Sequence, residues 1–343
     1  MGSVKDIVVL KEATEKEPGI GAFVFSDNYS VFDWGKMPDE IPDKGASLCL
    51  QAAYFFEQAE KRGLKTHYLG LIVKGGKRVR LDELTEPTNT MEIYLVRTIK
   101  PIFKDGKYDY SAFTPTLTNF LIPLEIIYRN IISEGSSLLE RLNAGTLSLE
   151  ELGLEDRPKL GEKLKKPILE ISTKFEAMDR YISIEEAKEL VCLDEREIEE
   201  IKRYVNKANA LITEIAEKAG LLNEDGKLEL AYNTNRELMI VDVAGTLDEC
   251  RFSYKGIPVS KEILRKFYKK TKWYEDVEKA KEKARERKIE DWKSLCESLP
   301  EPLAPKLKDL VSKMYKAATN ALIGKKLFEV PELEKIMNQL ENY

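Results

Sequence analysis

The sequence predicts an α/β (α+β) fold of two lobes, a β-rich N-terminal lobe and a larger mixed α/β lobe, with a ligand cleft between them. Strand-like apolar alternation dominates the first hundred residues, and helical periodicity takes over between further strands from Pro123 onward. We therefore divide the chain into a first lobe of residues 1–102, an inserted loop or linker of residues 103–122, and a second lobe of residues 123–343 with a helical C-terminus. Ligand sites concentrate in clefts between lobes.

The first lobe contains four expected strands, each an apolar run that is rich in β-branched and aromatic residues. They cover residues 5–10, 22–25, 68–73 and 92–99. A helix of about residues 45–62 interrupts the series, because apolar residues such as Leu48, Ala52 and Phe55 recur on one helical face. Residues 103–119 are polar and rich in turn residues, so we expect a long loop there.

Helix signals are clearest in the second lobe. Ser183 and Glu186 form a capping-box pattern, and Asp194 with Glu197 forms a second one. The apolar stripe that follows Asp194 predicts a helix that ends near Gly220. Most of the chain after Ser260 is expected to be helical, with residues 273–293 as a solvated helix.

The segment from Lys227 to Arg251 carries the strongest functional signal. Two apolar-alternating runs flank a polar turn of residues 233–236, which is typical of a β-hairpin. A four-residue loop would pair Tyr232 with Glu237 and place Lys227 opposite Asp242.

Glu229 would then lie diagonal to Asp242, so that one face of the hairpin carries a lysine and two carboxylates. The apolar side chains would point to the other face: Leu228, Leu230, Met239 and Val241. Magnesium bound to a nucleotide takes one or two carboxylates, and a lysine neutralises phosphate oxygens. The alternative is a solvated hairpin face with a cross-strand ion pair.

Composition excludes several classes of function. A net charge of -5 and a pI near 5.5 argue against a general affinity for nucleic acid or membranes. Charged residues make up 34% of the chain and lean on Lys and Glu, as in heat-adapted proteins. The chain shows neither a signal peptide nor a long apolar run, and its four cysteines are scattered, so we expect a cytoplasmic protein with reduced thiols.

The chain has a single histidine, His67, which argues against a Cys/His zinc site and against a Ser-His-Asp mechanism. We expect it to be a surface residue at a strand end.

Four further segments hold polar residues that a hydrophobic core would not accommodate. Arg129 ends an apolar strand and precedes a Gly-Ser step, which suits phosphate capture. Lys44 and Gly45 stand at a helix start, where free N–H groups attract anions. Residues 172–179 form a polar stretch, and residues 248–251 follow the hairpin. Plain turns and surface ion pairs, such as Arg129 with Glu125, are the alternatives.

The order of these segments along the chain resembles SAICAR synthetase, the family of phosphoribosylaminoimidazole-succinocarboxamide synthases in purine biosynthesis. The resemblance runs from Gly2 to about Gly324, and the Ser-Thr-Lys step at residues 172–174 and the spacing from Asp248 to Arg251 are its more specific parts. It implies two α/β lobes with ATP between them, the first lobe similar to that of protein kinases.

The resemblance also implies a reaction. The carboxylate of carboxyaminoimidazole ribotide (CAIR) would be joined to the amine of L-aspartate to give SAICAR, ADP and phosphate. ATP would first convert the carboxylate into an acyl phosphate, which the amine then attacks. Such a reaction depends on charge neutralisation and positioning more than on a nucleophilic side chain.

Site residues follow from the resemblance. Those implied to bind ATP are Lys5, Lys174, Lys227 and Glu229. Glu229 and Asp242 would hold Mg²⁺, and Lys227 and Asp242 would be catalytic. Those implied to bind the ribotide or aspartate are Asp33, Lys44, Gly45, Arg129, Ser136, Asp179, Arg251 and Arg265.

The chain departs from the family pattern at five positions: Ser3, Asn28, Val243, Glu249 and Cys250. The spacing between the arginine and serine of the phosphate segment is one residue longer than in the pattern, so Ser133 or Ser137 is an alternative to Ser136. Lost positive charge and a new carboxylate would weaken an anion site. These departures leave open a paralogue with another carboxylate or amine, a small-molecule kinase, and a non-catalytic nucleotide-binding protein. A homo-oligomer is also left open.

Overall fold

The first lobe is built on an antiparallel sheet in the order β1-β2-β5-β3-β4. The computed structural model describes residues 4–177, 179–287, 289 and 291–343. The strands are β1 (Lys5–Lys11), β2 (Gly19–Phe25), β3 (Tyr68–Ile72), β4 (Arg78–Val79) and β5 (Thr90–Leu95). Helix α1 (Lys44–Lys61) packs against this sheet, and the short 3₁₀ helix η1 (Leu81–Glu83) follows β4. The predicted strands and helix of this lobe are confirmed.

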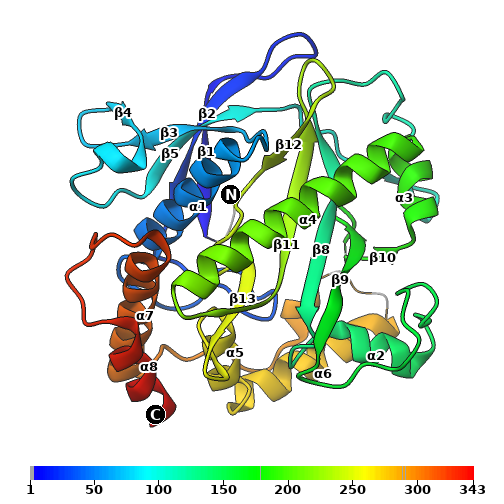
Figure 1. Cartoon of the computed structure of the whole chain (residues 1–343). Coiled ribbons are helices and arrows are strands. Elements are labelled where there is room, and N and C mark those ends of the chain that lie inside the picture. The colour runs from blue at the N-terminus through cyan, green and yellow to red at the C-terminus, as the bar shows by residue number, and fades with distance from the viewer. Residues whose placement is uncertain (1–3, 178, 288, 290) are drawn as a thin grey trace.

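The second lobe is built on a larger antiparallel sheet in the order β10-β9-β8-β11-β13-β14, with β12 paired to β11 (Figure 1). Its strands are β8 (Phe120–Ile131), β9 (Lys163–Thr173), β10 (Tyr181–Ile182), β11 (Leu222–Tyr232), β12 (Leu238–Val241), β13 (Cys250–Tyr254) and β14 (Ile257–Pro258). The predicted β-rich first lobe and mixed second lobe are therefore confirmed. The likeness of the first lobe to a kinase lobe stays a prediction, as do the domain limits.

The other helices lie between the strands of the second sheet along the chain or follow its last strand. They are α2 (Ser137–Ala144), α3 (Ile184–Val191), α4 (Glu195–Lys218), α5 (Glu262–Tyr268), α6 (Lys272–Arg287), η2 (Trp292–Leu295), α7 (Pro305–Ile323) and α8 (Leu333–Glu341). The capping box at Asp194 is confirmed, since its carboxylate accepts from the Glu197 amide at 2.8 Å. None of the described helices is long and apolar enough to cross a membrane.

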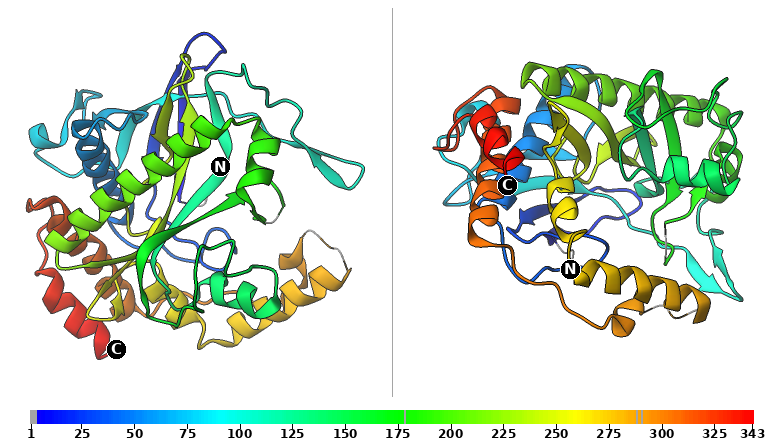
Figure 2. Two further views of the ribbon diagram at one scale, coloured as in Figure 1. Left: turned by 45° about the vertical axis from the view of Figure 1, so that its right-hand side comes forward. Right: turned by 90° about the horizontal axis from the view of Figure 1, so that it is seen from below.

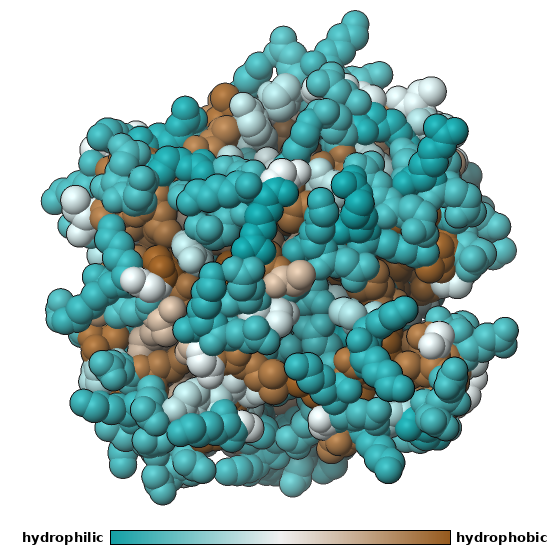
Figure 3. Space-filling view, in the orientation of Figure 1, coloured by the Kyte–Doolittle hydropathy of each residue, from teal (hydrophilic) through white to brown (hydrophobic). Residues whose placement is uncertain are grey.

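The two faces of the second sheet differ in chemistry. Helix α4 lies diagonally across one face, and α6 lies on the far side of the molecule from α4 (Figures 1 and 2). On the α4 side, Ile126 of β8 and Leu228 of β11 join the stripe that includes Ile201 and Ile212 in one apolar core. Apolar residues of α1 and α7 belong to the same core, so one hydrophobic core extends through both lobes. Much of the surface in the view of Figure 3 is hydrophilic.

Three local expectations are wrong. The segment expected as a loop contains a small hairpin of β6 (Ile102–Lys104) and β7 (Lys107–Asp109). Helix α6 is not fully solvated, because it buries Trp273 and four other residues along one side. His67 is no surface residue: it is 3% exposed, and its Nε2 atom lies 3.0 Å from the carbonyl oxygen of Asp242.

Candidate active site

The face of the second sheet opposite α4 is lined by charged side chains. Arg129 of β8 pairs with Asp225 of β11, and Glu125 pairs with Glu229. Paired residues, and residues two apart along a strand, point to the same face. The face therefore carries Glu125, Arg129, Glu170, Ser172, Asp225, Lys227 and Glu229. These charges form two clusters on one surface.

The first, which we call the lysine–carboxylate cluster, consists of Lys5, Glu125, Lys174, Lys227, Glu229, Asp242 and Glu249. The Lys227 Nζ atom lies 2.9 Å from a carboxylate oxygen of Glu125 and 3.5 Å from one of Glu249. Lys174, which follows β9, forms an ion pair with Glu229, and its Nζ atom lies 3.7 Å from Glu125. Every lysine of this cluster contacts at least one of its carboxylates.

The hairpin that carries this cluster has a different register from the predicted one. Tyr232 pairs with Leu238 rather than with Glu237, because the loop contains five residues instead of four. Glu229 consequently pairs with Val241, and Met239 and Val241 lie on the Glu229 face rather than opposite it. Ile240 takes their place beside Leu230 in the main core.

Asp242 still joins the cluster, but through a different partner. It follows the last paired residue of β12 and has a left-handed backbone with φ of 57°, which ends the strand alternation. Its carboxylate lies 2.8 Å from the Lys5 Nζ atom of β1 in the first lobe. The predicted contact with Lys227 is therefore wrong, although both residues belong to the same cluster.

The pKa values of the two central carboxylates of this cluster, Glu229 and Asp242, shift in opposite directions. Burial and the negative charge of Asp242 raise the pKa of Glu229 to about 7, against the lowering effect of Lys174. Burial also disfavours the charged form of Asp242, but the charge and hydrogen bond of Lys5 outweigh it and hold the pKa of Asp242 below its ordinary value. One of the two carboxylates therefore titrates near neutrality.

These two carboxylates fit the requirements of a nucleotide-bound Mg²⁺. The donors are hard oxygen atoms, and their mutual repulsion would be relieved by a cation. Among the described residues no group of three or more His, Cys, Asp or Glu side chains could hold a metal alone. A metal here would therefore need oxygen atoms from another molecule, such as phosphates.

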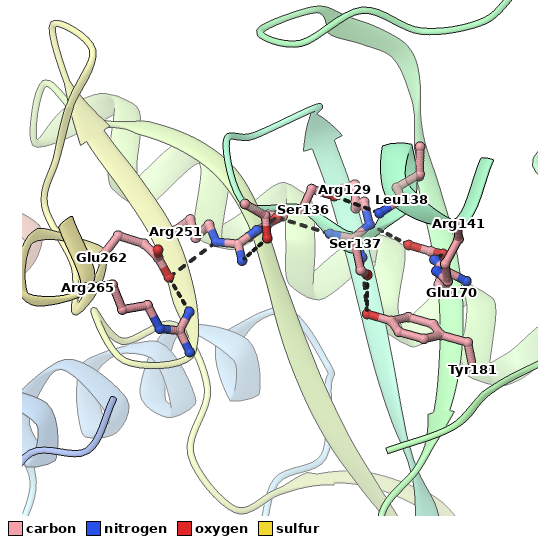
Figure 4. Close-up of polar contacts among 12 residues, drawn as sticks. Arg129, Ser136, Ser137, Leu138, Arg141, Glu170, Tyr181, Arg251, Glu262 and Arg265 are labelled. Atoms are coloured by element: carbon pink, nitrogen blue, oxygen red, sulfur yellow. Dashed lines mark hydrogen bonds and ion pairs between the residues drawn. The ribbon is translucent and has the colours of Figure 1, made fainter. Parts of the chain in front are cut away.

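The second cluster, which we call the arginine cluster, lies further along the same face (Figure 4). It consists of Arg129, Arg141, Arg251 and Arg265 with Glu170, Asp225 and Glu262. The Arg251 Nη1 atom lies 2.8 Å from Asp225, and the Arg251 Nε atom lies 3.5 Å from Glu262. Burial raises the pKa of Asp225 despite these arginines. The four arginines outnumber the three carboxylates by one.

The predicted phosphate ligands meet around this cluster. Arg129 is 3% exposed and pairs with Glu170 and Asp225, not with Glu125. Arg251 and Arg265 border a cavity of about 190 Å³. Of the serine alternatives, Ser133 also borders the cavity. The other two stand at the start of α2, where Ser136 is the N-cap residue and accepts from the Leu138 amide, and Ser137 donates to Tyr181.

Lys44 and Gly45 each contact a residue outside the two clusters. The Lys44 side chain is fully buried, and its Nζ atom lies 2.6 Å from Asp248, which also accepts from Tyr315 at 2.7 Å. The Gly45 amide donates to the carboxylate of Asp27 at 2.9 Å, so an internal anion already occupies this helix start. A Cβ atom on Gly45 would lie 2.7 Å from the carbonyl oxygen of Phe25.

The remaining predicted residues are Asp179 and Asp33. Burial and the nearby charge of Glu125 raise the pKa of Asp179. Asp33 is 80% exposed and lies 2.9 Å from the Lys281 Nζ atom of α6.

Three of the five departures from the family pattern have local partners in this chain. Glu249 pairs with Lys227, and the Cys250 Sγ atom lies 3.3 Å from the Tyr128 hydroxyl. Asn28 forms an isolated bridge with Glu40. Val243 is buried, and Ser3 lies outside the described residues.

Several residues of the two clusters and their surroundings were missed in the sequence. Asp225 belongs to the same alternation as Lys227 and Glu229, which extends two residues upstream of the predicted hairpin. Glu170 could have been found from its place in the apolar run that ends at the Ser-Thr-Lys step. Glu262 and Tyr181 carry no signal in the sequence, since tertiary packing alone brings them to the cluster.

Known proteins of one family are similar to this chain. The SAICAR synthetase family model matches residues 2–281. A putative phosphoribosylaminoimidazole-succinocarboxamide synthase of Archaeoglobus fulgidus is 50% identical over 341 residues, 99% of each chain. The phosphoribosylaminoimidazole-succinocarboxamide synthase of Thermoplasma acidophilum is 33% identical over 305 residues, 87% of this chain and 92% of its own.

Solved structures show the same fold. SAICAR synthase from Saccharomyces cerevisiae, complexed with SAICAR, aligns with a TM-score of 0.62 and 22% identity over 95% of this chain and 94% of its own. A SAICAR synthetase in complex with ADP aligns with a TM-score of 0.56 and 22% identity over 88% of this chain and 99% of its own. Because a family model covers most of the chain and a relative is half identical from end to end, this chain belongs to the SAICAR synthetase family, whose members are ligases that form a C–N bond.

Proposed function

We propose that this protein uses ATP to join CAIR to L-aspartate, giving SAICAR, ADP and phosphate in purine biosynthesis. Family membership supports the reaction, and the complexes of two structural relatives with ADP and with SAICAR support the ligands. The four cysteines are all free, which supports a reducing compartment such as the cytoplasm.

The observation that carries the proposal is the continuous charged face with a cluster at each end. Glu125 and Arg129 are four residues apart on β8, about 13 Å along a strand. A ribotide has its phosphate at one end and its carboxylate at the other. Its phosphate would bind in the arginine cluster while its carboxylate reaches the lysine–carboxylate cluster, where the triphosphate of ATP would lie.

The residues of the lysine–carboxylate cluster would position the phosphates and neutralise their charge. Lys5, Lys174 and Lys227 each contact a carboxylate and would turn to phosphate oxygens when ATP binds. Glu229 and Asp242 would hold Mg²⁺, which supplies further charge neutralisation when bound.

With the phosphates held, the carboxylate oxygen of CAIR attacks the terminal phosphorus of ATP and displaces ADP. The aspartate amine then attacks the acyl carbon, phosphate leaves, and the amine loses its proton. Alignment of the three substrates supplies most of the rate, because neither step needs a nucleophile from the protein. Asp33, Asp179 and Lys44 are the predicted contacts for aspartate and the ribotide along this path.

An omission assay tests the proposal. Purified protein is mixed with Mg-ATP, CAIR and L-aspartate, and ADP and SAICAR are followed while each component is left out in turn. We expect SAICAR only when all three substrates are present. ADP formation that needs no aspartate, together with transfer of phosphate to a hydroxyl, would identify a small-molecule kinase instead. Nucleotide binding without turnover would identify a non-catalytic protein.

A further inference from the structure

Tyr181 lies at the edge of the arginine cluster and has no assigned role. It belongs to the two-residue strand β10, where it pairs with Ser172 and so points to the charged face of the sheet. Its side chain is half-buried, which leaves it accessible to a ligand. Figure 4 shows its ring beside Arg141, whose guanidinium carbon lies 3.6 Å from the ring centroid.

The hydroxyl oxygen of Tyr181 accepts two hydrogen bonds. The Ser137 hydroxyl donates to it at 3.0 Å, and the Arg129 Nη2 atom donates to it at 3.4 Å. A phenol has one proton to donate and two lone pairs that accept. Both lone pairs are therefore in use, and the proton needs an acceptor that no described residue supplies.

The charges around this hydroxyl favour an anion as the acceptor. Arg129 and Arg141 both contact Tyr181, and their shared carboxylate partner, Glu170, is already paired to both. Arg129 itself is nearly buried, and each of its three nitrogen atoms already donates one hydrogen bond. Tyr181 therefore extends the cluster toward a ligand at a point where Arg129 has little exposed surface of its own.

We propose that Tyr181 is a substrate-binding residue whose hydroxyl donates a hydrogen bond to the phosphate of the ribotide. Ser137 and Arg129 orient that hydroxyl by occupying its lone pairs. The proposal rests on the function proposed above, because that function supplies the phosphate. A hydrogen bond to a phosphate far from the reacting carboxylate contributes equally to the ground state and the transition state, so it lowers KM and leaves kcat unchanged.

The test is Tyr181→Phe, which keeps the ring beside Arg141 and removes only the hydroxyl. We expect KM for CAIR to rise roughly tenfold or more, in line with the loss of one hydrogen bond to a charged group. The KM values for ATP and aspartate, and kcat, should stay near those of the wild type. With the unphosphorylated riboside as substrate, the variant and the wild type should be equal. Tyr254→Phe is the matched control, because that hydroxyl contacts Glu334 away from the cluster.

Calorimetry with ribose 5-phosphate separates this inference from the proposed function. If the wild type makes no SAICAR but Tyr181→Phe still loses affinity for ribose 5-phosphate, the ligase function fails and the phosphate contact stands. If SAICAR is made and both proteins have the same KM for CAIR, the phosphate contact fails. An equal loss of affinity for all three substrates, together with a lower melting temperature, would show that Tyr181 has a structural role. That result would also overturn the proposed phosphate contact.

Ser137→Ala gives an independent variant should Tyr181→Phe not fold. It removes one of the two donors that orient the hydroxyl, so a smaller rise in KM for CAIR is expected. Unchanged affinity of Ser137→Ala for ribose 5-phosphate would contradict the proposal.

Discussion

At the scale of single residues, the lysine–carboxylate cluster brings together side chains from both lobes. Lys5 comes from the first strand of the chain, whereas Lys174, Lys227 and Glu229 come from the second sheet. The lysines form ion pairs with carboxylates of the cluster, which offsets their positive charges. A triphosphate would compete with these carboxylates for the lysines, and a bound Mg²⁺ would offset part of the added negative charge.

Removal of either predicted catalytic residue should impair catalysis strongly. Lys227→Ala and Asp242→Ala should each lower kcat/KM by about a hundredfold or more, since electrostatic stabilisation of this kind contributes on that scale. Steady-state kinetics of SAICAR formation provides the measurement. Lys255→Ala serves as the control, because that lysine is 68% exposed and pairs with Glu334 on the surface. Near wild-type activity in both site variants would remove the lysine–carboxylate cluster from the mechanism.

The raised pKa of Glu229 predicts that nucleotide binding depends on pH. Glu229 with a pKa of about 7 is partly protonated at neutral pH, and a metal requires the charged form. Binding of Mg-ATP should therefore release a proton between about pH 6 and 7.5, and affinity should rise across that range. Calorimetry in buffers of different ionisation enthalpy detects the proton. Glu229→Gln should bind more weakly and release none, and proton release that persists in this variant would assign it to another group.

Glu229 affects folding stability in the opposite direction to nucleotide affinity: its contribution to stability falls as the pH rises. Because the folded protein raises the pKa of Glu229 above its unfolded value of about 4.5, the folded state binds the proton more tightly. The resulting stability is present below pH 4.5 and is lost as the pH rises toward 7. Asp242 has a lowered pKa, so its contribution is present at neutral pH and is lost only as the pH falls below about 4. Urea unfolding at pH 5 and pH 8 measures the contribution of Glu229 alone, because the contribution of Asp242 changes only below about pH 4. Glu229→Gln should lose this difference in stability between the two pH values.

At the scale of secondary-structure elements, the sequence predicted the four longer strands of the first sheet, helices α1 and α4 and the two strands of the hairpin, but not the register of the hairpin. The alternation of Lys227 and Glu229 identified β11, and capping residues identified α4. The turn contains no glycine to mark its type, and Arg236 adopts a left-handed backbone that its side chain does not predict. A one-residue error in loop length moved Met239 and Val241 to the wrong face.

Pairing between distant segments was also beyond sequence reasoning. Arg129 meets Asp225 because β8 and β11 are neighbours in the sheet, and neither local periodicity nor spacing encodes which strands are adjacent. Residue types therefore predicted the kinds of charge in the site, whereas the individual ion pairs required the fold.

The start of α1 offers a test at this scale. Gly45 packs so closely on the backbone of Phe25 that an added Cβ atom must displace it. Gly45→Ala should therefore lower the free energy of unfolding by about 1–3 kcal/mol, as overpacking usually does. Urea denaturation measures the change. Lys61→Ala, at an exposed position near the end of the same helix, should stay within about 0.5 kcal/mol of the wild type. Equal stability of Gly45→Ala and the wild type would show that this contact relaxes freely.

At the scale of the whole molecule, Asp248 links parts of the chain that are far apart in sequence. It follows the hairpin of the second lobe and contacts Lys44 at the start of α1 and Tyr315 of α7. Helices α1 and α7 pack together (Figure 1). The buried ion pair therefore joins the first lobe, the second sheet and the C-terminal helices at a single point.

This position gives two different expectations for Lys44. As a direct substrate ligand, its loss would raise KM and leave stability unchanged. As a structural link, Lys44→Met would leave the carboxylate of Asp248 buried without its cation and cost about 3–5 kcal/mol in the free energy of unfolding. Full burial of the Lys44 side chain favours the structural expectation.

A double-mutant cycle decides between the two roles. Asp248→Asn keeps a hydrogen-bond acceptor for Tyr315 without a charge, so the double variant Lys44→Met, Asp248→Asn should recover part of the stability lost by Lys44→Met alone. Urea unfolding of the four proteins provides the coupling energy, and steady-state kinetics of the same proteins provides KM for each substrate. A higher KM for CAIR or aspartate with no loss of stability would restore Lys44 to the substrate site. A stability loss that the second substitution partly reverses would establish that this lysine holds the two lobes together.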